Sequence, residues 1–175
     1  MMAARWFALA VHARQEKGAA AELAAHGVEV FLPLKVERRA WSDRVQNVEL
    51  ALFPGYLFVR VTMSAARRVE LLQVHQVIDL VGRLPGDERI ARSIPDQDIS
   101  SLQTVVASPY NLDPVERLVP GKTILVAAGP LKGVRGIVVH EPNGKRRLVV
   151  QIELLGRGVA TELAAADLVE APAEP

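Results

Sequence analysis

The alternation of apolar and polar residues is clearest in residues 52–61, where it predicts a strand central to the first half of the chain. Alternate positions point to opposite sides of this strand: Leu57 and Val59 to one side, and Tyr56, Phe58 and Arg60 to the other. Pro54 has no N–H to donate and Gly55 tolerates unusual backbone angles, so we expect the strand to begin or bend there. Taken alone, the local pattern favours burial of both sides.

Strand and helix patterns alternate around this stretch up to residue 106. Short apolar runs predict strands and alanine-rich or amphipathic segments predict helices: strands at 6–11, 28–34 and 77–81, and helices at 13–26, 64–76 and 93–106. Ser64 is suited to cap the start of the second helix, and Gly27 to end the first. This alternation predicts an α/β sandwich, in which helices pack against a single sheet.

Residues 35–47 differ from their surroundings because charged side chains replace the apolar pattern. The basic residues are Lys35, Arg38, Arg39 and Arg44, the acidic ones are Glu37 and Asp43, and Trp41 lies among them. One interpretation is a solvated hairpin. The other is a basic surface with an aromatic tip, where guanidinium groups meet phosphate and the ring stacks on a base. The sequence leaves both interpretations open.

The chain changes character after residue 106. Prolines interrupt residues 107–119, which we interpret as a linker. Beyond it, apolar runs separated by glycine turns predict strands at 123–128, 134–140, 148–154, 159–163 and 167–169. Short strands at this density predict a small closed barrel, because closure removes exposed edges. The predicted organisation is a first domain at 1–106, a linker at 107–119, a second domain at 120–171 and a tail at 172–175.

Composition removes several classes of function. The chain has no cysteine, which excludes disulfides, thiolate metal sites and a cysteine nucleophile. The net charge is +1, so no overall field attracts nucleic acid. The apolar run near the N-terminus is too short for a signal peptide, and no run is long enough to cross a membrane. We therefore predict a cytoplasmic protein.

Candidate chemistry is sparse. None of the four histidines has a different ligand type at metal-binding spacing. Gly121-Lys122-Thr123 resembles the end of a phosphate-binding loop, but Glu116 stands where that pattern needs glycine, and a strand follows instead of a helix. We therefore predict no enzymatic activity, no metal and no cofactor.

The strongest local motif spans residues 129–139. Gly129, Gly133 and Gly136 are separated by two gaps, and each gap holds a basic residue. Three glycines at this spacing predict a tight strand–loop–strand turn. This is the pattern of the KOW motif.

With this motif in place, the chain resembles the NusG family of transcription elongation factors over nearly its whole length. The matching segments are Trp6-Phe7, residues 52–59, Ile94-Pro95-Asp96, residues 129–139 and residues 154–157. The segment 41–44 and the short first domain resemble the specialised RfaH-like and UpxY-like paralogues, which often serve long polysaccharide operons.

The resemblance implies an α+β fold. It consists of a NusG-like N-terminal α/β sandwich and a small C-terminal five-stranded KOW, SH3-like β-barrel. Some paralogues hold the last domain as a helical hairpin, but the β-branched residues and glycines of this chain favour strands there.

The resemblance also implies a transcription elongation and antitermination regulator. Its first domain would bind the clamp helices of RNA polymerase and suppress pausing or termination. The matching polymerase-binding positions are Trp6, Phe53, Pro54, Tyr56 and Phe58. We expect the last four of these to be exposed, with Leu57 and Val59 pointing inward. The second domain would recruit a ribosomal small-subunit protein or Rho through Leu154, Leu155 and Arg157.

The distribution of charge adds a nucleic-acid face to this interpretation. We expect the protein to bind the polymerase as a monomer. Four arginines would then face the non-template DNA: Arg14, Arg38, Arg39 and Arg44. Two other classes stay open, a ribosome- or RNA-associated KOW protein without a polymerase role and a small α/β enzyme. Salt-sensitive RNA binding without polymerase would favour the former, and a deep pocket with convergent titratable groups the latter.

Overall fold

The computed structural model describes residues 3–84, 87–163 and 171–172. Its first sheet has the strand order β2-β5-β1-β6, with antiparallel pairing throughout. The strands are β1 (Arg5–Val11), β2 (Glu29–Phe31), β5 (Tyr56–Val61) and β6 (Val77–Leu80). The predicted strand start after Pro54-Gly55 is confirmed, because β5 begins at Tyr56.

Helices α1 (Glu16–Ala25) and α2 (Ala65–Leu72) contribute to the core on one face of this sheet. Leu57 and Val59 point into this core and are fully buried, as predicted. The predicted N-cap of α2 is confirmed, since the Ser64 hydroxyl accepts a hydrogen bond from the Arg67 N–H at 3.0 Å. Gly27 follows the C-cap of α1 with a left-handed φ of 78°, in keeping with the predicted helix end.

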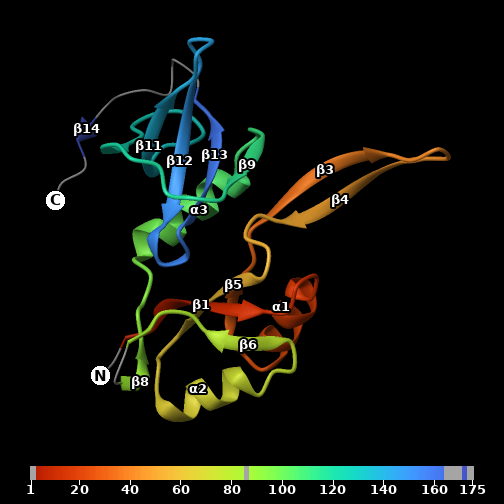
Figure 1. The fold of residues 1–175 in the computed structure, drawn as a ribbon, viewed down its shortest axis with the longest axis vertical. Helices are drawn as coiled ribbons and strands as arrows, with labels where there is room; N and C mark the ends of the chain where they lie inside the picture. Colours follow the sequence, from red (N-terminus) through yellow and green to blue (C-terminus); the bar gives the residue numbers. More distant parts are fainter. Residues whose placement is uncertain (1–2, 85–86, 164–170, 173–175) are drawn as a thin grey trace.

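A two-stranded arm leaves the first sheet between β2 and β5. It consists of β3 (Leu34–Ala40) and β4 (Val45–Ala51), which pair only with each other among the described strands. Figure 1 shows the arm extending well away from both larger sheets. The predicted hairpin is therefore present, and its tip is solvated. A shorter pair, β7 (Arg83–Leu84) and β8 (Asp87–Ala91), follows β6.

The second sheet has the strand order β14-β10-β11-β12-β13-β9. Its strands are β9 (Leu112–Val115), β10 (Thr123–Leu125), β11 (Arg135–His140), β12 (Arg146–Ile152), β13 (Arg157–Glu162) and β14 (Ala171–Pro172). A short 3-10 turn, η1 (Glu153–Leu155), joins β12 to β13. The strand predicted at 167–169 and the tail residues 173–175 lie outside the described residues.

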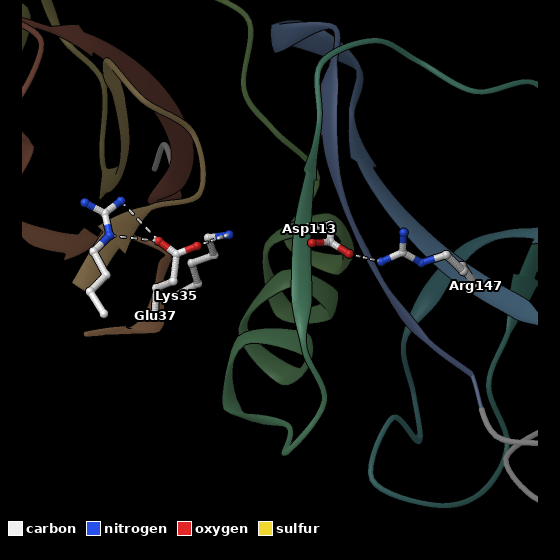
Figure 2. Close-up of polar contacts among 5 residues, drawn as sticks. Lys35, Glu37, Asp113 and Arg147 are labelled. Atoms are coloured by element: carbon white, nitrogen blue, oxygen red, sulfur yellow. Dashed lines mark hydrogen bonds and ion pairs between the residues drawn. The ribbon is translucent and has the colours of Figure 1, made fainter. Parts of the chain in front are cut away.

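Strand β9 lies inside the segment predicted to be a linker. It pairs with β13 at the end of the strand order, opposite the end formed by β14. The sequence interpretation took the prolines of this segment as signs of a linker, because proline cannot donate a hydrogen bond to a strand ladder. Pro114 is nevertheless tolerated in β9, because β9 is an edge strand. An ion pair between Asp113 and Arg147 joins β9 to β12 (Figure 2).

Helix α3 (Asp96–Ala107) is the main departure from the predicted sandwich. We expected it against the first sheet only, but its closest neighbours are strands β11 and β12 of the second sheet, together with β1. Figure 1 shows it beside the end of the second sheet that lies nearer the first. Its buried residues Ile99, Leu102 and Val105 belong to one apolar core that reaches from Trp6 to Leu163. The two sheets are therefore joined by a shared core.

Polar contacts fix α3 to the second sheet. The Ser101 hydroxyl, only 1% exposed, accepts a hydrogen bond from the Arg135 N–H at 2.9 Å. The Gln97 amide donates to the Ser101 hydroxyl and to the Gly133 carbonyl, both at 3.1 Å. On the first-sheet side, the chain just before α3 is held by Ile94, whose N–H donates to the Trp6 carbonyl at 2.8 Å.

In the described ranges, no helix has the length and hydropathy of a membrane span.

Candidate functional site

The second face of the first sheet carries a cluster of aromatic rings, which we call the aromatic face: Trp6, Phe31, Phe53 and Phe58. The centroid distances are 6.5 Å from Trp6 to Phe31, 6.1 Å from Phe31 to Phe58 and 5.7 Å from Phe53 to Phe58. Alternation places these rings opposite Leu57 and Val59, as expected. Phe31 was missed by the sequence analysis, although its register partner on β5 is Phe58.

The prediction that Phe53 and Phe58 are exposed is wrong. Phe53 is 1% exposed and Phe58 is fully buried, and Trp6 beside them is 6% exposed. The reason is that α3 and the second sheet contribute to the same apolar core. The alternation of side chains within one strand cannot show whether residues far along the chain bury those side chains.

Pro54 and Tyr56 form the accessible rim of the aromatic face. Pro54 is exposed and Tyr56 is half-buried. The intervening Gly55 adopts a φ of 83°, and its N–H donates to the Glu16 carboxylate on α1 at 2.9 Å. Glu16 is itself buried, so it holds the Pro-Gly corner against the body of the first sheet. Nothing in the local sequence pattern pointed to Glu16.

Two of the predicted partner-binding residues of the second domain approach residues of the first half of the chain, and the third packs against the shared core. The Arg157 guanidinium stacks over the Tyr56 ring, 5.4 Å from its centroid. Leu154 lies so close to Gly82 that a Cβ built on the glycine would meet its Cδ1 at 2.8 Å. Leu155 is half-buried and packs against the shared core. The structure therefore brings together two sets of residues that were predicted to bind different partners.

A charge cluster lies where α3 meets the second sheet. Partial burial and the nearby Glu153 carboxylate raise the pKa of Asp98 above 3.8, while the Arg135 guanidinium opposes this shift. A raised pKa in the folded state means that ionisation of Asp98 costs folding free energy. Its stabilising contribution is present below the pKa of the unfolded chain and is lost as pH rises through the folded-state pKa.

Glu153→Gln is expected to raise the free energy of unfolding at neutral pH, because it removes the like charge beside Asp98. The partly solvated setting limits the gain to less than about 1 kcal/mol. Urea denaturation at a series of pH values measures it, and the gain should fade as acid protonates Asp98. Glu116→Gln, at an exposed glutamate beyond β9, is the control. A gain that does not change with pH would contradict this electrostatic origin.

The predicted nucleic-acid-facing arginines are not gathered on one surface. Arg14 lies in the turn between β1 and α1, with a left-handed φ of 66°. On the arm, the register pairs Arg38 with Asn47 and Arg39 with Gln46, so these two arginines point to opposite faces. Arg44 lies beside Trp41, with its guanidinium 5.2 Å from the ring centroid.

The glycine motif forms a turn with only part of its predicted composition. Gly129 and Gly133 have φ values of 81° and 88°, which fit glycine in a tight turn. The prediction that Gly136 belongs to this turn is wrong, because it lies within β11. A Cβ there would meet the Val149 carbonyl oxygen at 2.7 Å, so glycine is needed for close strand approach.

Two joined sheets, a buried aromatic face and a solvated arm define a mixed α/β protein. Within the ranges that the structure describes, no group of His, Cys, Asp and Glu residues has a metal-binding arrangement. The family model for "Transcription termination factor nusG" matches residues 4–103, more than half of the chain. The chain belongs to the NusG family of transcription termination/antitermination factors.

Relatives and solved structures agree with this assignment. The transcription termination/antitermination proteins NusG of Yersinia pestis and Escherichia coli (strain K12) are each 27% identical over 139 residues, covering 77% of this chain and 74% of the relative. A solved structure described as "Domain interaction in Thermotoga maritima NusG" has a TM-score of 0.55 and 17% identity. It covers 94% of this chain and 95% of the other, and it supports the fold.

Proposed function

We propose that this protein is a transcription elongation and antitermination regulator that binds RNA polymerase through the aromatic face and its rim. The observation that carries the proposal is the continuous ring cluster of the aromatic face, Trp6, Phe31, Phe58 and Phe53, which ends at the surface in Pro54 and Tyr56. Large apolar side chains around a desolvated centre are typical of protein–protein interfaces. The bound polymerase conformation would be the active one, so binding would shift its population away from the paused state.

The cover over the aromatic face supports a helical partner. Helix α3 already contributes Ile99, Leu102 and Val105 to the core that contains these rings. A face that packs with one amphipathic helix has the shape and apolar character to accept another. On this proposal, the polymerase clamp helices contact the aromatic face after the second sheet and α3 have moved aside. Tyr56 and Arg157 would separate in that step.

We propose a related role for the second sheet. Its glycine turn and short strands are in keeping with a KOW barrel, in which Leu154, Leu155 and Arg157 would bind a ribosomal small-subunit protein or Rho. In the closed arrangement Arg157 contacts Tyr56, Leu154 approaches Gly82 and Leu155 packs against the shared core, so recruitment would follow the same separation. The arm segment from Trp41 to Arg44 supports a place among the specialised RfaH-like and UpxY-like paralogues. We propose that the protein acts as a cytoplasmic monomer without a cofactor.

Replacing both rim residues, Pro54→Ala with Tyr56→Ala, is expected to weaken binding to core RNA polymerase by about 30-fold or more. Truncation of an interface anchor costs about 2 kcal/mol or more, and each 1.4 kcal/mol is a factor of ten in affinity. Biolayer interferometry with immobilised polymerase measures the change. The rim is preferable to Phe53, because alanine at that buried position would disturb the fold itself.

The matched control is Ile78→Ala on β6, which removes a 55% exposed apolar side chain away from the rim. Far-UV circular dichroism checks that both variants are folded. Unchanged polymerase affinity in the rim variant would refute the site. Salt-sensitive RNA binding by a chain that does not associate with polymerase would favour the alternative function, a ribosome- or RNA-associated KOW protein.

A further inference from the structure

A groove lies between the base of the arm and the edge of the second sheet. Its volume is about 550 Å³, and its two walls are residues 34–37 of β3 and residues 108–113, which lead into β9. Figure 2 shows Lys35 and Glu37 on the arm beside Asp113 on β9. Consecutive residues of a strand point to opposite faces, so a groove that touches four of them in a row runs along the edge of β3.

The backbone of β3 carries unpaired hydrogen-bonding groups along this edge. Two bonds fix the alternation of the β3–β4 ladder: the Leu52 N–H donates to the Pro33 carbonyl at 3.0 Å, and the Trp41 N–H donates to the Arg44 carbonyl at 2.7 Å. Because bonded and non-bonded pairs alternate, the odd-numbered residues of β3 bond to β4. The N–H and C=O of Val36 therefore point outward, and among the described strands β3 has no second neighbour.

The two edges that border the groove differ in how well they can accept a strand. In β9, Pro114 has no N–H, and proline in an edge strand turns its nitrogen away from the neighbouring strand, which discourages further pairing. In β3 there is no proline, and Val36 is 65% exposed. Lys35 and Glu37 neutralise each other through an ion pair at 3.8 Å. The edge of β3 is therefore open to pairing, and β9 forms the opposite wall.

The lining of the groove holds one carboxylate without a cation. It contains two basic and three acidic side chains. Asp113 pairs with Arg147, whose Nε also lies 3.6 Å from the Glu141 carboxylate. Glu162 stands opposite Arg147 in the β12–β13 register and is exposed, but no ion pair is found for it within the described ranges. A ligand with a basic side chain near Glu162 would balance this charge.

We propose that the groove binds an extended segment of a partner protein, which adds to the free edge of β3 as a further strand and directs a basic side chain toward Glu162. Backbone hydrogen bonds to β3 would provide affinity, and the β9 wall with Glu162 would provide selectivity. This site is separate from the aromatic face. It rests on the proposed function only in one respect: a segment held between the arm and β9 stabilises the closed arrangement, so it would oppose polymerase binding.

A phage-displayed library of random heptapeptides, selected on the immobilised full chain, is the probe. We expect enrichment of peptides that alternate apolar and polar residues and contain one lysine or arginine. Absence of enrichment over wells without protein would overturn the proposal. The most enriched peptide is then labelled with fluorescein and titrated with the full chain, and binding is followed by anisotropy.

Two N-methylated copies of this peptide test whether it binds as a strand. One copy is methylated on its odd backbone nitrogens and the other on its even ones. A strand that adds to one edge uses only every second N–H, so one copy should lose binding while the other keeps most of it. Equal affinity of the two copies would contradict pairing along an edge.

Val36→Pro is expected to weaken binding of the selected peptide by about tenfold, because it removes an outward N–H and leaves a peptide carbonyl unpaired. The β3–β4 ladder does not use this N–H, so the variant should stay folded. Ala40→Pro is the matched control, since Ala40 also points its N–H outward but lies beyond the groove. Equal peptide affinity of Val36→Pro and the unmodified chain would overturn the proposal.

Glu162→Gln tests the charge without altering any backbone group. It is expected to weaken the selected peptide by about threefold, which is the size of one exposed ion pair. Glu116→Gln, at an exposed glutamate outside the lining, is the control. A dimer that appears in size-exclusion chromatography and is lost in Val36→Pro would identify a second copy of this chain as the occupant and overturn the choice of partner.

Polymerase capture separates this inference from the proposed function. A saturating concentration of the selected peptide should weaken capture of the unmodified chain by polymerase, because the peptide favours the closed arrangement. The same concentration should leave capture of Val36→Pro unchanged. If the unmodified chain binds the peptide in this groove but is not captured by polymerase at all, the proposed function fails and the peptide site stands.

Discussion

Phe58→Ala is expected to lower the free energy of unfolding by about 3–5 kcal/mol. The Phe58 side chain is fully buried and contacts the rings of Phe31 and Phe53. Alanine would leave a cavity in the core that joins the two sheets, and cavities of this kind add to the lost transfer free energy. Urea denaturation followed by far-UV circular dichroism measures the change.

The control for this experiment removes apolar area from the surface instead. Ile78→Ala acts on a side chain that is 55% exposed, so its effect should stay within about 0.5 kcal/mol. If Phe58→Ala cost no more than this control, the aromatic face would have to be open to solvent in the free protein. The sequence-based prediction of an exposed face would then be restored.

Gly158→Ala is expected to destabilise the second sheet by about 2–3 kcal/mol. A Cβ at this position of β13 would lie 2.5 Å from the Val150 carbonyl oxygen and 3.2 Å from the Gln151 Cα. Both are backbone atoms of β12, so relief requires the two strands to move apart, and overpacking has costs of this size. Thermal unfolding followed at a second-sheet reporter, such as a fluorophore on a cysteine introduced at Glu162, would detect the loss.

Gly18→Ala provides the matched glycine substitution with the opposite expected sign. Gly18 lies within α1, and a Cβ there would meet the Gln76 amide nitrogen at an ordinary 3.5 Å. Alanine in a helix interior is favoured over glycine by about 0.5–1 kcal/mol, so this variant should gain stability. Equal effects of the two substitutions would mean that strand spacing does not determine the need for Gly158.

The parts of the fold that local chemistry determines could be predicted from the sequence. Alternation located the strand after Gly55, and a hydroxyl at Ser64 identified the start of α2, because both signals act within a few residues. One of the two interpretations left open for the basic segment around Trp41 was a solvated hairpin, and the structure has a hairpin there. In each case the partner of the signal lies next to it in the chain.

The remainder depends on contacts between distant residues. Phe53 and Phe58 are buried in a core that includes α3 and the second sheet. The alternation of residues within a strand carries no information about these distant elements. The hydrogen bond from Gly55 to Glu16 joins residues 39 positions apart, and β9 is a strand because β13 offers it a free edge. Without knowledge of β13, the proline and the charged residue of β9 predict a linker.

The shared core has a consequence for affinity. Any partner that takes the aromatic face must first separate it from α3 and the second sheet, so its apparent dissociation constant is the intrinsic one divided by the open fraction. Each 1.4 kcal/mol that favours the closed form therefore weakens the observed affinity tenfold. Substitutions at residues that never touch the partner, such as Leu154, would then tune occupancy. On the proposed function, the second sheet would therefore set the concentration at which the first sheet binds its partner.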